Sequence, residues 1–523
     1  MPPFRPHTLT DLLDERAGRT PAQAAFYWDD QPVSYAHLRD GVNRFAVLLG
    51  EYGVARGDRV LIRLANGPDF FQAFYGALRA GAIAVPVFPA SGSERIAALA
   101  RLCDARVLVA PRAADEDDIP GVRAVSVAES DTRPAFGSFP EVAPDAVAFL
   151  QYTSGSTGLP KGVMLSHHGL LTNIGQLIAG MSITADDCFV SWLPVYHDMG
   201  LILMTMVPFF LGAKLVLLPT SLANARPWLG SIERYRGTLT AAPDFAYRLA
   251  VRYVRDPSSY DLSSLRLALD AAEPVRPRTI EGFERAFRLR NVVIAGYGLA
   301  EATVGVCTWT PGMPPLVDDR GVVSVGRAFP DVDIQIIEHD ELLPAGKNGE
   351  IVVRSPANTR GYFSDEAETA RLFWRESYIK TGDLGYLDEA GRLFVTGRLK
   401  NIIKHGGETI FPQEAEQIAD HLPFVRRSAA VGIDSGGPEG EQLYVFVEVS
   451  KVAGLDESAL HESAVGVVEA IHAQLGLRPG RVYLLRPHGV PLTHNGKIQH
   501  AALRQQYLSG ELRASNAILF PAY

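Results

Sequence analysis

Short apolar runs and amphipathic stretches alternate along the first half of the chain. The run RVLIRLA at 59–65 is short and apolar like a buried strand, whereas 68–82 spaces its apolar residues for one face of a helix. A further apolar run at 82–88 predicts the next strand, and the same rhythm returns at 213–219 and 291–298. Strands that alternate with helices predict parallel α/β sheets.

Beyond residue 320 the pattern changes to period two. Apolar and polar residues alternate in 321–339 and again in 348–356, which predicts antiparallel strands or a barrel-like subdomain. After 397–401 a shorter α+β pattern continues to residue 523, and it is long enough for a lobe of its own. We therefore expect a large α/β lobe followed by a smaller α+β lobe.

The composition is that of a globular protein with a large core. The 523 residues are 47% hydrophobic and 21% charged, which excludes a disordered chain and fits about three domains, or one large lobe and a small one. The net charge of −9 provides no overall basic character, so nucleic-acid binding is disfavoured. Cys103, Cys188 and Cys307 lie far apart in the sequence, so we expect neither a disulfide framework nor a zinc site. We expect the protein to be located in a reducing cytoplasm.

Two segments bear on membranes and secretion. Residues 1–18 contain no apolar run and carry several acidic residues, so we expect no secretory signal. The apolar stretch 201–218 contains Pro208 and Lys214, so we expect buried secondary structure there and no membrane span.

A loop rich in hydroxyls and glycines follows the apolar run at 146–152. It reads YTSGSTGLPKG from Tyr152 to Gly162. Glycines allow backbone N–H groups to face an anion, hydroxyls add donors, and Lys161 adds a positive charge suited to phosphate. A flexible surface turn is the alternative, but the strand that leads into the loop argues against it. The Walker A spacing and the G-x-S-x-G elbow are both absent, which disfavours a P-loop kinase and a serine hydrolase.

The segment TSGSTGLPKG resembles the phosphate loop of the adenylate-forming (ANL) superfamily, which includes acyl-CoA synthetases, peptide-synthetase adenylation domains, luciferases and fatty acyl-AMP ligases. Four further motifs match in the expected order: YGLAE at 297–301, TGD at 381–383, GRLK at 397–400 and GK at 496–497. The chain resembles the fatty acyl-AMP ligase branch in particular. The segments that carry this resemblance are FLQY at 149–152, WLPVYHDMG at 192–200, AEPVR at 272–276 and YGLAEAT at 297–303.

This resemblance implies an architecture and a two-step reaction. Two α/β sheets and a distorted β-barrel would form an N-terminal adenylation lobe at 1–396, followed by a hinge at 397–401 and a small, mobile α+β lobe at 402–523. With ATP and Mg²⁺, a carboxylate would attack the α-phosphorus and release pyrophosphate, and a thiol would then attack the acyl-adenylate. Between the steps the small lobe would rotate, moving Lys497 out and bringing the segment Lys404–Gly407 in.

The family also implies roles for the matched residues. Lys497 would neutralise charge on the α-phosphate, Glu301 and Thr157 would hold Mg²⁺, and Asp383 would accept the ribose hydroxyls. Lys400 would be the hinge residue. Further nucleotide contacts would come from the following positions: Thr153, Ser154, Gly155, Ser156, Gly158, Lys161, Ala272, Glu273, Tyr297 (stacked on adenine), Gly298 and Arg398. Plain structural roles remain open: a helix-start carboxylate for Glu301, a core aromatic for Tyr297, a turn for Asp383 and surface lysines for Lys400 and Lys497.

The acyl pocket is expected around Tyr196, Phe245, Gly296 and Leu299. His197 would border this pocket and orient the substrate carboxylate, or it would be a structural histidine. It precedes Asp198 directly, and we expect no productive hydrogen bond between these two adjacent side chains.

The sequence departs from its neighbours at the acyl wall. It reads APDFAY at 242–247, where the fatty acyl-AMP ligase branch commonly has Gly-Pro-Asn-Phe-Ala-Tyr. A buried Asp244 needs a partner, and a substrate ammonium would supply one, as in stand-alone β-amino-acid ligases of macrolactam polyketide pathways, which this chain resembles. Asp198 is a second candidate for the ammonium, and an N-cap of the following helix is the structural alternative for Asp244. Asp270 replaces a common Asn and is expected on the nucleotide side, and 361–381 is short for this branch.

We therefore expect ATP-dependent activation of a β-amino acid and its transfer to the phosphopantetheine thiol of a separate carrier protein, since no carrier domain follows Lys497. A medium- or long-chain fatty acyl-AMP ligase is the main alternative, and a coenzyme A ligase is the next. A catalytically inactive adenylate-binding scaffold is disfavoured because the motif residues are retained together.

Overall fold

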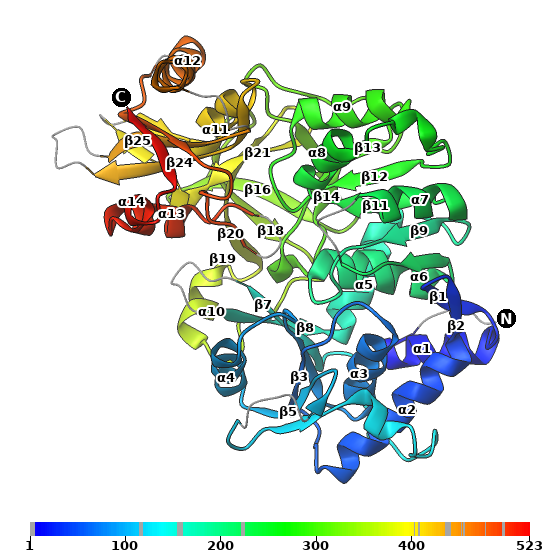
Figure 1. Cartoon of the computed structure of the whole chain (residues 1–523). Helices are drawn as coiled ribbons and strands as arrows, with labels where there is room; N and C mark the ends of the chain where they lie inside the picture. The colour runs from blue at the N-terminus through cyan, green and yellow to red at the C-terminus, as the bar shows by residue number, and fades with distance from the viewer. Residues whose placement is uncertain are drawn as a thin grey trace.

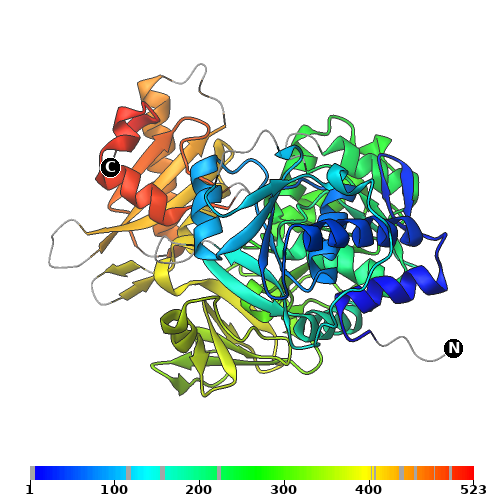
Figure 2. The same ribbon diagram turned by 90° about the horizontal axis from the view of Figure 1, so that it is seen from below.

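The computed structural model places two lobes side by side, with the C-terminal lobe drawn in orange and red in Figure 1. The two termini lie at opposite ends of the molecule (Figure 2). The residues that the structure describes are 6–113, 119–153, 160–220, 225–401, 403–405, 408–434, 441–450, 452, 456–475, 477–493 and 497–522.

A six-stranded sheet occupies the lower part of Figure 1, with the strand order β6-β5-β3-β4-β7-β8. All neighbouring pairs are parallel except β7 and β8. Alternate residues of the strands enter two different cores, which shows that helices cover both faces. The elements are β3 (Arg59–Ile62), β4 (Ile83–Pro86), β5 (Ala105–Val109), β6 (Arg123–Val125), β7 (Val147–Thr153) and β8 (Lys161–Ser166), with α2 (Tyr35–Glu51) and α3 (Pro68–Arg79) on one face and α4 (Ser93–Leu102) on the other.

A second sheet of fifteen strands forms the rest of the large lobe. Its parallel part runs in the order β13-β12-β11-β9-β10-β1, and its antiparallel part continues from β14 to β17 without a break in hydrogen bonding. The parallel strands and the edge strand are β1 (Ala24–Trp28), β2 (Gln31–Ser34), β9 (Cys188–Ser191), β10 (Lys214–Leu217), β11 (Leu239–Ala242), β12 (Leu267–Asp270) and β13 (Val293–Tyr297).

The antiparallel strands arise where the sequence alternates with period two. They are β14 (Cys307–Thr308), β15 (Ser324–Ala328), β16 (Asp333–Glu338), β17 (Glu341–Leu342), β18 (Gly349–Arg354), β19 (Phe373–Trp374), β20 (Tyr378–Leu387) and β21 (Leu393–Arg398). The predicted strands and the predicted change from parallel to antiparallel pairing are confirmed, although β3 ends three residues and β13 one residue before the end of its predicted range.

Helices surround this sheet, and several begin with proline in the first turn, where a missing N–H costs nothing. They are α1 (Leu9–Arg19), α5 (His167–Gly180), α6 (Val207–Leu211), α7 (Arg226–Tyr235), α8 (Asp244–Tyr253), α9 (Pro277–Phe287) and α10 (Glu366–Leu372). The apolar stretch 201–218 is buried as the end of a π-helix (Met199–Met206), α6 and β10, as predicted. Among the described residues, no helix has both the length and the apolar character needed to cross a membrane.

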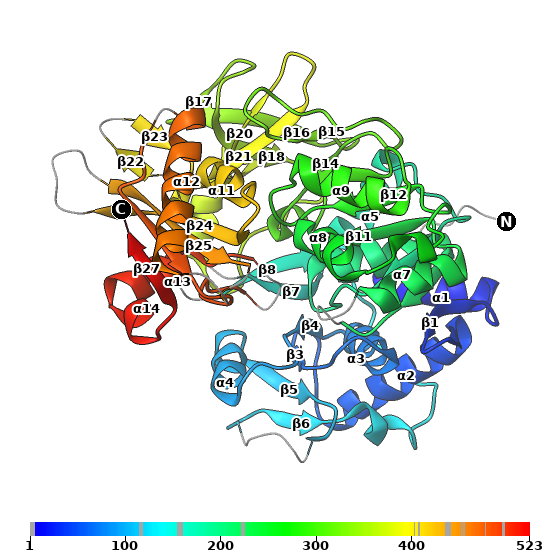
Figure 3. The same cartoon turned by 45° about the horizontal axis from the view of Figure 1, so that its top comes forward.

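The C-terminal lobe is a four-stranded sheet with a separate core on each face. Figure 3 shows α11 and α12 on one side of the sheet and α13 and α14 on the other. Ile403 and Ile410 pack into the core under α11 and α12, so the chain joins this lobe directly after β21. The elements are β22 (Ile403–His405), β23 (Glu408–Ile410), α11 (Pro412–Asp420), β24 (Val425–Asp434), β25 (Glu441–Val449), α12 (Glu457–Leu475), β26 (Arg481–Leu485), α13 (His500–Leu508), α14 (Glu511–Ala514) and β27 (Ile518–Ala522).

Candidate active site

The carboxyl ends of β11, β12 and β13 lie next to one another, because these strands are parallel neighbours. The loops that follow them carry three of the sequence-predicted segments: Pro243–Phe245, Ala271–Arg276 and Gly298–Thr303. Ligands of open α/β sheets bind at this edge, outside the strand ends. The topology therefore brings together residues that are far apart in the sequence.

A nucleotide-side cluster forms around Asp383. The Tyr297 hydroxyl donates to its Oδ2 at 2.7 Å, and Arg398 Nε lies 2.7 Å from its Oδ1. Asp383 and Arg398 are opposite each other across β20 and β21, and Asp383 is buried. Burial raises the pKa of Tyr297, so its hydroxyl remains a donor. The structure thus unites three residues that the sequence assigned to one nucleotide; their contacts with ATP remain a prediction. Lys400 follows in a short, exposed 3-10 turn.

Glu301 lies in a 3-10 turn (Ala300–Ala302) directly after the strand end. Its Oε1 accepts the Tyr362 hydroxyl at 2.8 Å, and burial raises its pKa. The loop folds back tightly: a Cβ on Gly298 would lie 1.7 Å from the carbonyl oxygen of Val304, and Thr303 adopts a φ of +73°. Such strained backbone is characteristic of functional sites.

The predicted phosphate loop connects two paired strands. Thr153 ends β7 and Lys161 begins β8, and these two residues are register partners, so the predicted strand before the loop is confirmed. The Lys161 ammonium forms an ion pair with Glu368 of α10 and lies 5.0 Å from the centroid of the Tyr362 ring. The predicted residues Ser154, Gly155, Ser156, Thr157 and Gly158 lie outside the described residues, as do Gly406, Gly407 and Gly496.

A mainly apolar cavity lies beside these groups. Five predicted residues line it, together with Trp192, Pro194 and others: Tyr196, His197, Phe245, Ala272 and Lys497. The predicted pocket residues Asp198, Asp244, Gly296 and Leu299 do not line it. Ala272 turns the chain at the cavity with a φ of +71°. A second hollow, on the C-terminal lobe near Arg486 and Gln506, contains none of the predicted site residues.

Lys497 reaches this cavity from the small lobe. Burial lowers the pKa of its ammonium group, and the negative charge of Asp198 opposes that effect. The loop before it is closed by hydrogen bonds in both directions between Thr493 and Lys497. The structure therefore brings Lys497 of the small lobe and residues of the large lobe to one cavity, and the catalytic role of Lys497 remains a prediction.

His197 and Asp198 are bonded to each other, contrary to our expectation. His197 Nδ1 lies 2.7 Å from Asp198 Oδ1, which also accepts the backbone N–H of Met199. Burial alone would raise the pKa of Asp198, but His197, and then Lys497, lower it. Asp198 is the N-cap residue of the π-helix that begins at Met199, so the same carboxylate holds both the helix start and His197.

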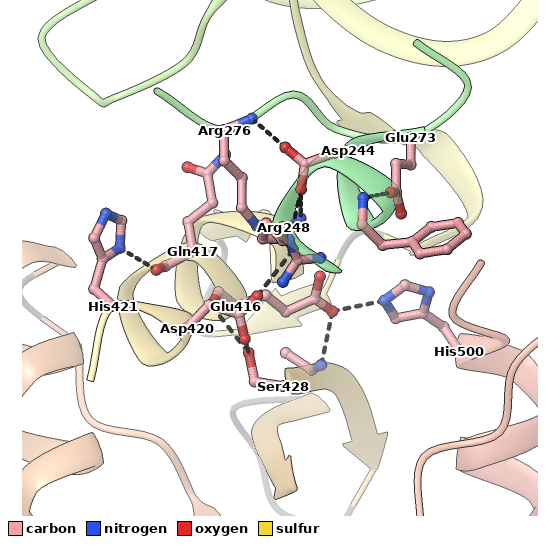
Figure 4. Close-up of polar contacts among 12 residues, drawn as sticks. Asp244, Arg248, Glu273, Arg276, Glu416, Gln417, Asp420, His421, Ser428 and His500 are labelled. Atoms are coloured by element: carbon pink, nitrogen blue, oxygen red, sulfur yellow. Dashed lines mark hydrogen bonds and ion pairs between the residues drawn. The ribbon is translucent and has the colours of Figure 1, made fainter. Parts of the chain in front are cut away.

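Asp244 does not line the cavity that its neighbours Pro243 and Phe245 line, and its carboxylate points toward Arg276 and Arg248 (Figure 4). Its buried carboxylate accepts the backbone N–H of Arg276 at 3.0 Å and Arg276 Nη1 at 2.9 Å, and Arg248 Nε lies 2.9 Å away. It does not cap its own helix, because Pro243 is the N-cap residue. In the sequence, Arg248 could have been found from its i,i+4 spacing to Asp244.

Two further carboxyl groups, those of Asp270 and Glu273, lie close to Asp244. Glu273 Oε1 accepts the backbone N–H of Phe245, and Asp270 is fully buried with no hydrogen-bond partner for either oxygen among the described residues. Burial, followed by Asp244 and Glu273, raises the pKa of Asp270 well above its usual range. Asp270 therefore lies with Asp244 and with Glu273, a predicted nucleotide contact, and its placement on the nucleotide side remains a prediction.

Comparison with known proteins identifies the family of the chain. The AMP-binding enzyme family matches residues 13–363. A 4-hydroxyphenylalkanoate adenylyltransferase of Mycobacterium marinum is 31% identical, covering 96% of this chain and 91% of that protein. The medium-chain-fatty-acid–[acyl-carrier-protein] ligase JamA of Moorena producens is 30% identical, covering 97% and 96%.

The fold comparison gives the same answer. A structure from a study of fatty acyl-adenylate ligases of E. coli and L. pneumophila superposes with a TM-score of 0.87 at 27% identity, covering 98% of this chain and 100% of that one. The chain therefore belongs to the AMP-binding enzyme family of the ANL superfamily, and it is an ATP-dependent, acyl-adenylate-forming ligase.

Proposed function

We propose that this enzyme activates a β-amino acid as its acyl-adenylate and passes the acyl group to the phosphopantetheine thiol of a separate carrier protein, as in polyketide macrolactam biosynthesis. One observation carries the adenylation step: Lys497 of the small lobe lines the same cavity as Tyr196, His197 and Phe245 of the large lobe. A cation in a largely apolar cavity stabilises developing negative charge far more than it would in water.

The first step joins the acid to AMP. A carboxylate oxygen of the substrate attacks the α-phosphorus, the bond to the β-phosphate oxygen breaks, and pyrophosphate leaves. No covalent bond to the enzyme is needed, so catalysis consists of positioning and charge stabilisation. Lys497 would stabilise the α-phosphate oxygens, and His197, held by Asp198, would orient the attacking carboxylate.

Mg²⁺ fits the residues present. It prefers one or two carboxylates combined with phosphate oxygens. Glu301 offers such a carboxylate: it is buried, it accepts the hydroxyl of Tyr362, and no ion pair of the described residues includes it. The ion would neutralise charge on the leaving pyrophosphate, and Thr157 is the second proposed ligand.

The charge balance behind the acyl wall supports an amine-bearing substrate. Three carboxyl groups, Asp244, Asp270 and Glu273, lie with two guanidiniums, Arg248 and Arg276, and Asp270 stays protonated unless a further cation is present. A substrate ammonium near Phe245 would be such a cation, because it would favour the ionised form of these carboxyl groups. We propose that Asp244 exchanges Arg248 for the ammonium, because the Arg248 side chain is 31% exposed and can turn to solvent.

ATP–pyrophosphate exchange with paired acids tests this proposal. The two acids have equal chain length, and only one carries a 3-amino group. We expect exchange with the amino acid, and we expect Asp244→Asn to lower it while leaving any weak exchange with the plain acid unchanged. Preference for the plain acid would instead favour a medium- or long-chain fatty acyl-AMP ligase.

The acceptor is tested separately. Thioester formation is measured with a holo-carrier protein and with coenzyme A at equal concentration. We expect the carrier to be acylated faster, since the relative JamA is an acyl-carrier-protein ligase. Faster acylation of coenzyme A would make the enzyme an acyl-CoA ligase.

A further inference from the structure

Helix α11 lies between Arg276 of the large lobe and His500, the first residue of α13 (Figure 4). Asp420, its last residue, faces the large lobe, where its Oδ2 lies 2.9 Å from Arg276 Nη2. Glu416, one turn earlier, faces the start of α13, where its Oε1 lies 2.6 Å from His500 Nε2. His500 opens α13, directly after the Lys497 segment.

Arg276 joins the two lobes through a shielded contact. It holds Asp244 of the large lobe and Asp420 of the small lobe with different nitrogens, and the side chains of these aspartates are 0% and 8% exposed. Asp420 is oriented by the hydroxyl of Ser428 at 2.8 Å. Charge-assisted contacts of this kind are strong and directional when water is excluded.

A second interlobe bond provides a contrast. Arg278 Nη1 donates to the carbonyl oxygen of His421 at 3.3 Å, in an exposed position. Water and salt screen such contacts, so they add little rigidity. Arg278 therefore serves as a matched control for Arg276 on the same face.

The middle of α11 is anchored within the small lobe. The buried Glu416 carboxylate also accepts the backbone N–H of Ala430 at 2.8 Å, so it is fixed to the sheet of the small lobe. Lys497 itself forms no ion pair within the described part of the chain, although it lines the cavity. Its position therefore depends on how the small lobe is docked.

We propose that Arg276 is a positioning residue that seats Lys497 in the acyl cavity, acting through Asp420, helix α11 and the contact between Glu416 and His500. The same guanidinium holds Asp244, so the wall of the acyl pocket and the catalytic lysine are connected through one side chain. This inference rests on the proposed adenylation activity.

The test measures both half-reactions of the full-length enzyme. Asp420→Ala removes the small-lobe partner without touching the acyl wall. Acid-dependent pyrophosphate exchange should fall about a hundredfold, because small displacements of catalytic groups are that costly. Thioester formation from supplied acyl-adenylate and holo-carrier should be unchanged, and Arg278→Ala should behave as wild type in both half-reactions. The thermal unfolding midpoint should fall in Asp420→Ala, because Arg276 loses a buried partner, and it establishes that the variant is folded at the assay temperature.

Arg276→Ala and the double variant complete a cycle. If the two residues act as one unit, the double variant should lose no more exchange than the worse single variant. Equal losses in both half-reactions, additive losses in the double variant, or an Asp420→Ala enzyme indistinguishable from Arg278→Ala would overturn the inference. Should Arg276→Ala not fold, Asp420→Ala alone decides. A wild type without acid-dependent exchange would overturn the proposed function, and the inference with it.

Discussion

The side chains that are predicted to bind the nucleotide already form contacts with other residues of the protein. Asp383 is held by Tyr297 and Arg398, and Lys161 by Glu368. Ligand binding at this site therefore exchanges contacts, and the groups are oriented before the ligand arrives. Such preorganisation lowers the cost of binding and of charge stabilisation.

Asp383 offers the simplest test on the nucleotide side. Asp383→Asn removes the charge that pairs with Arg398 and the acceptor proposed for the ribose hydroxyls. Since hydrogen bonds to charged groups contribute about 1.5–3 kcal/mol, the KM for ATP should rise roughly tenfold to a hundredfold. The ATP dependence of pyrophosphate exchange measures it, and a KM equal to that of wild type would exclude the ribose role.

Asp270 gives a prediction about stability and pH. Because burial raises its pKa, the folded protein keeps a proton that the unfolded chain releases above about pH 4. The stability from this group is therefore complete at acid pH and is lost as the pH rises through the raised pKa, at about 1.4 kcal/mol per pH unit. Asp270→Asn should gain stability over wild type as the pH increases.

Thermal unfolding at a series of pH values measures this difference. Asp186→Asn, at an exposed aspartate, is the control and should follow wild type throughout. A difference between Asp270→Asn and wild type that is constant with pH would show that Asp270 is ionised in the folded protein.

The sequence was sufficient to predict roles for residues that belong to a local motif, such as Lys161, Asp383 and Lys497. It missed the residues that orient them, because Tyr362, Glu368 and Arg276 meet their partners only in the folded chain. It also misjudged the His197–Asp198 contact, since the backbone conformation that lets two adjacent side chains meet is set by the folded chain.

At the scale of elements, the site depends on loops that turn back sharply at strand ends. The loop after β13 positions Glu301 and requires Gly298 where the backbone of Val304 passes. Of these strands, β13 was predicted from the apolar run at 291–298, and it ends one residue before that run does. The sharp return was not, because it depends on backbone that arrives from later in the chain.

Gly298→Ala tests this loop. The added Cβ would overlap the Val304 carbonyl oxygen, which must move and carry the Glu301 turn with it. Such overpacking costs about 1–3 kcal/mol, so we expect a folded protein whose pyrophosphate exchange is strongly reduced. Gly282→Ala, at a helical glycine with open space around it, is the control, and equal activity of the two variants would contradict the prediction.

At the scale of the molecule, two lobes share one site. The period-two pattern after residue 320 and the short α+β segment after residue 401 were enough to predict both lobes, because each has its own apolar core. The boundaries 1–396, 397–401 and 402–523 remain predictions. The docking of the lobes could not be read from the sequence, since it rests on single side chains such as Arg276 and Asp420.

The most direct test of this account is Lys497→Ala assayed in both half-reactions. Removing the cation should lower acid-dependent pyrophosphate exchange at least a hundredfold, the loss typical for one electrostatic stabiliser of a transition state. Acyl transfer from supplied acyl-adenylate to the carrier thiol should continue at the wild-type rate. Equal loss of both half-reactions, or exchange that persists in the variant, would contradict the role given to Lys497 and the site built around it.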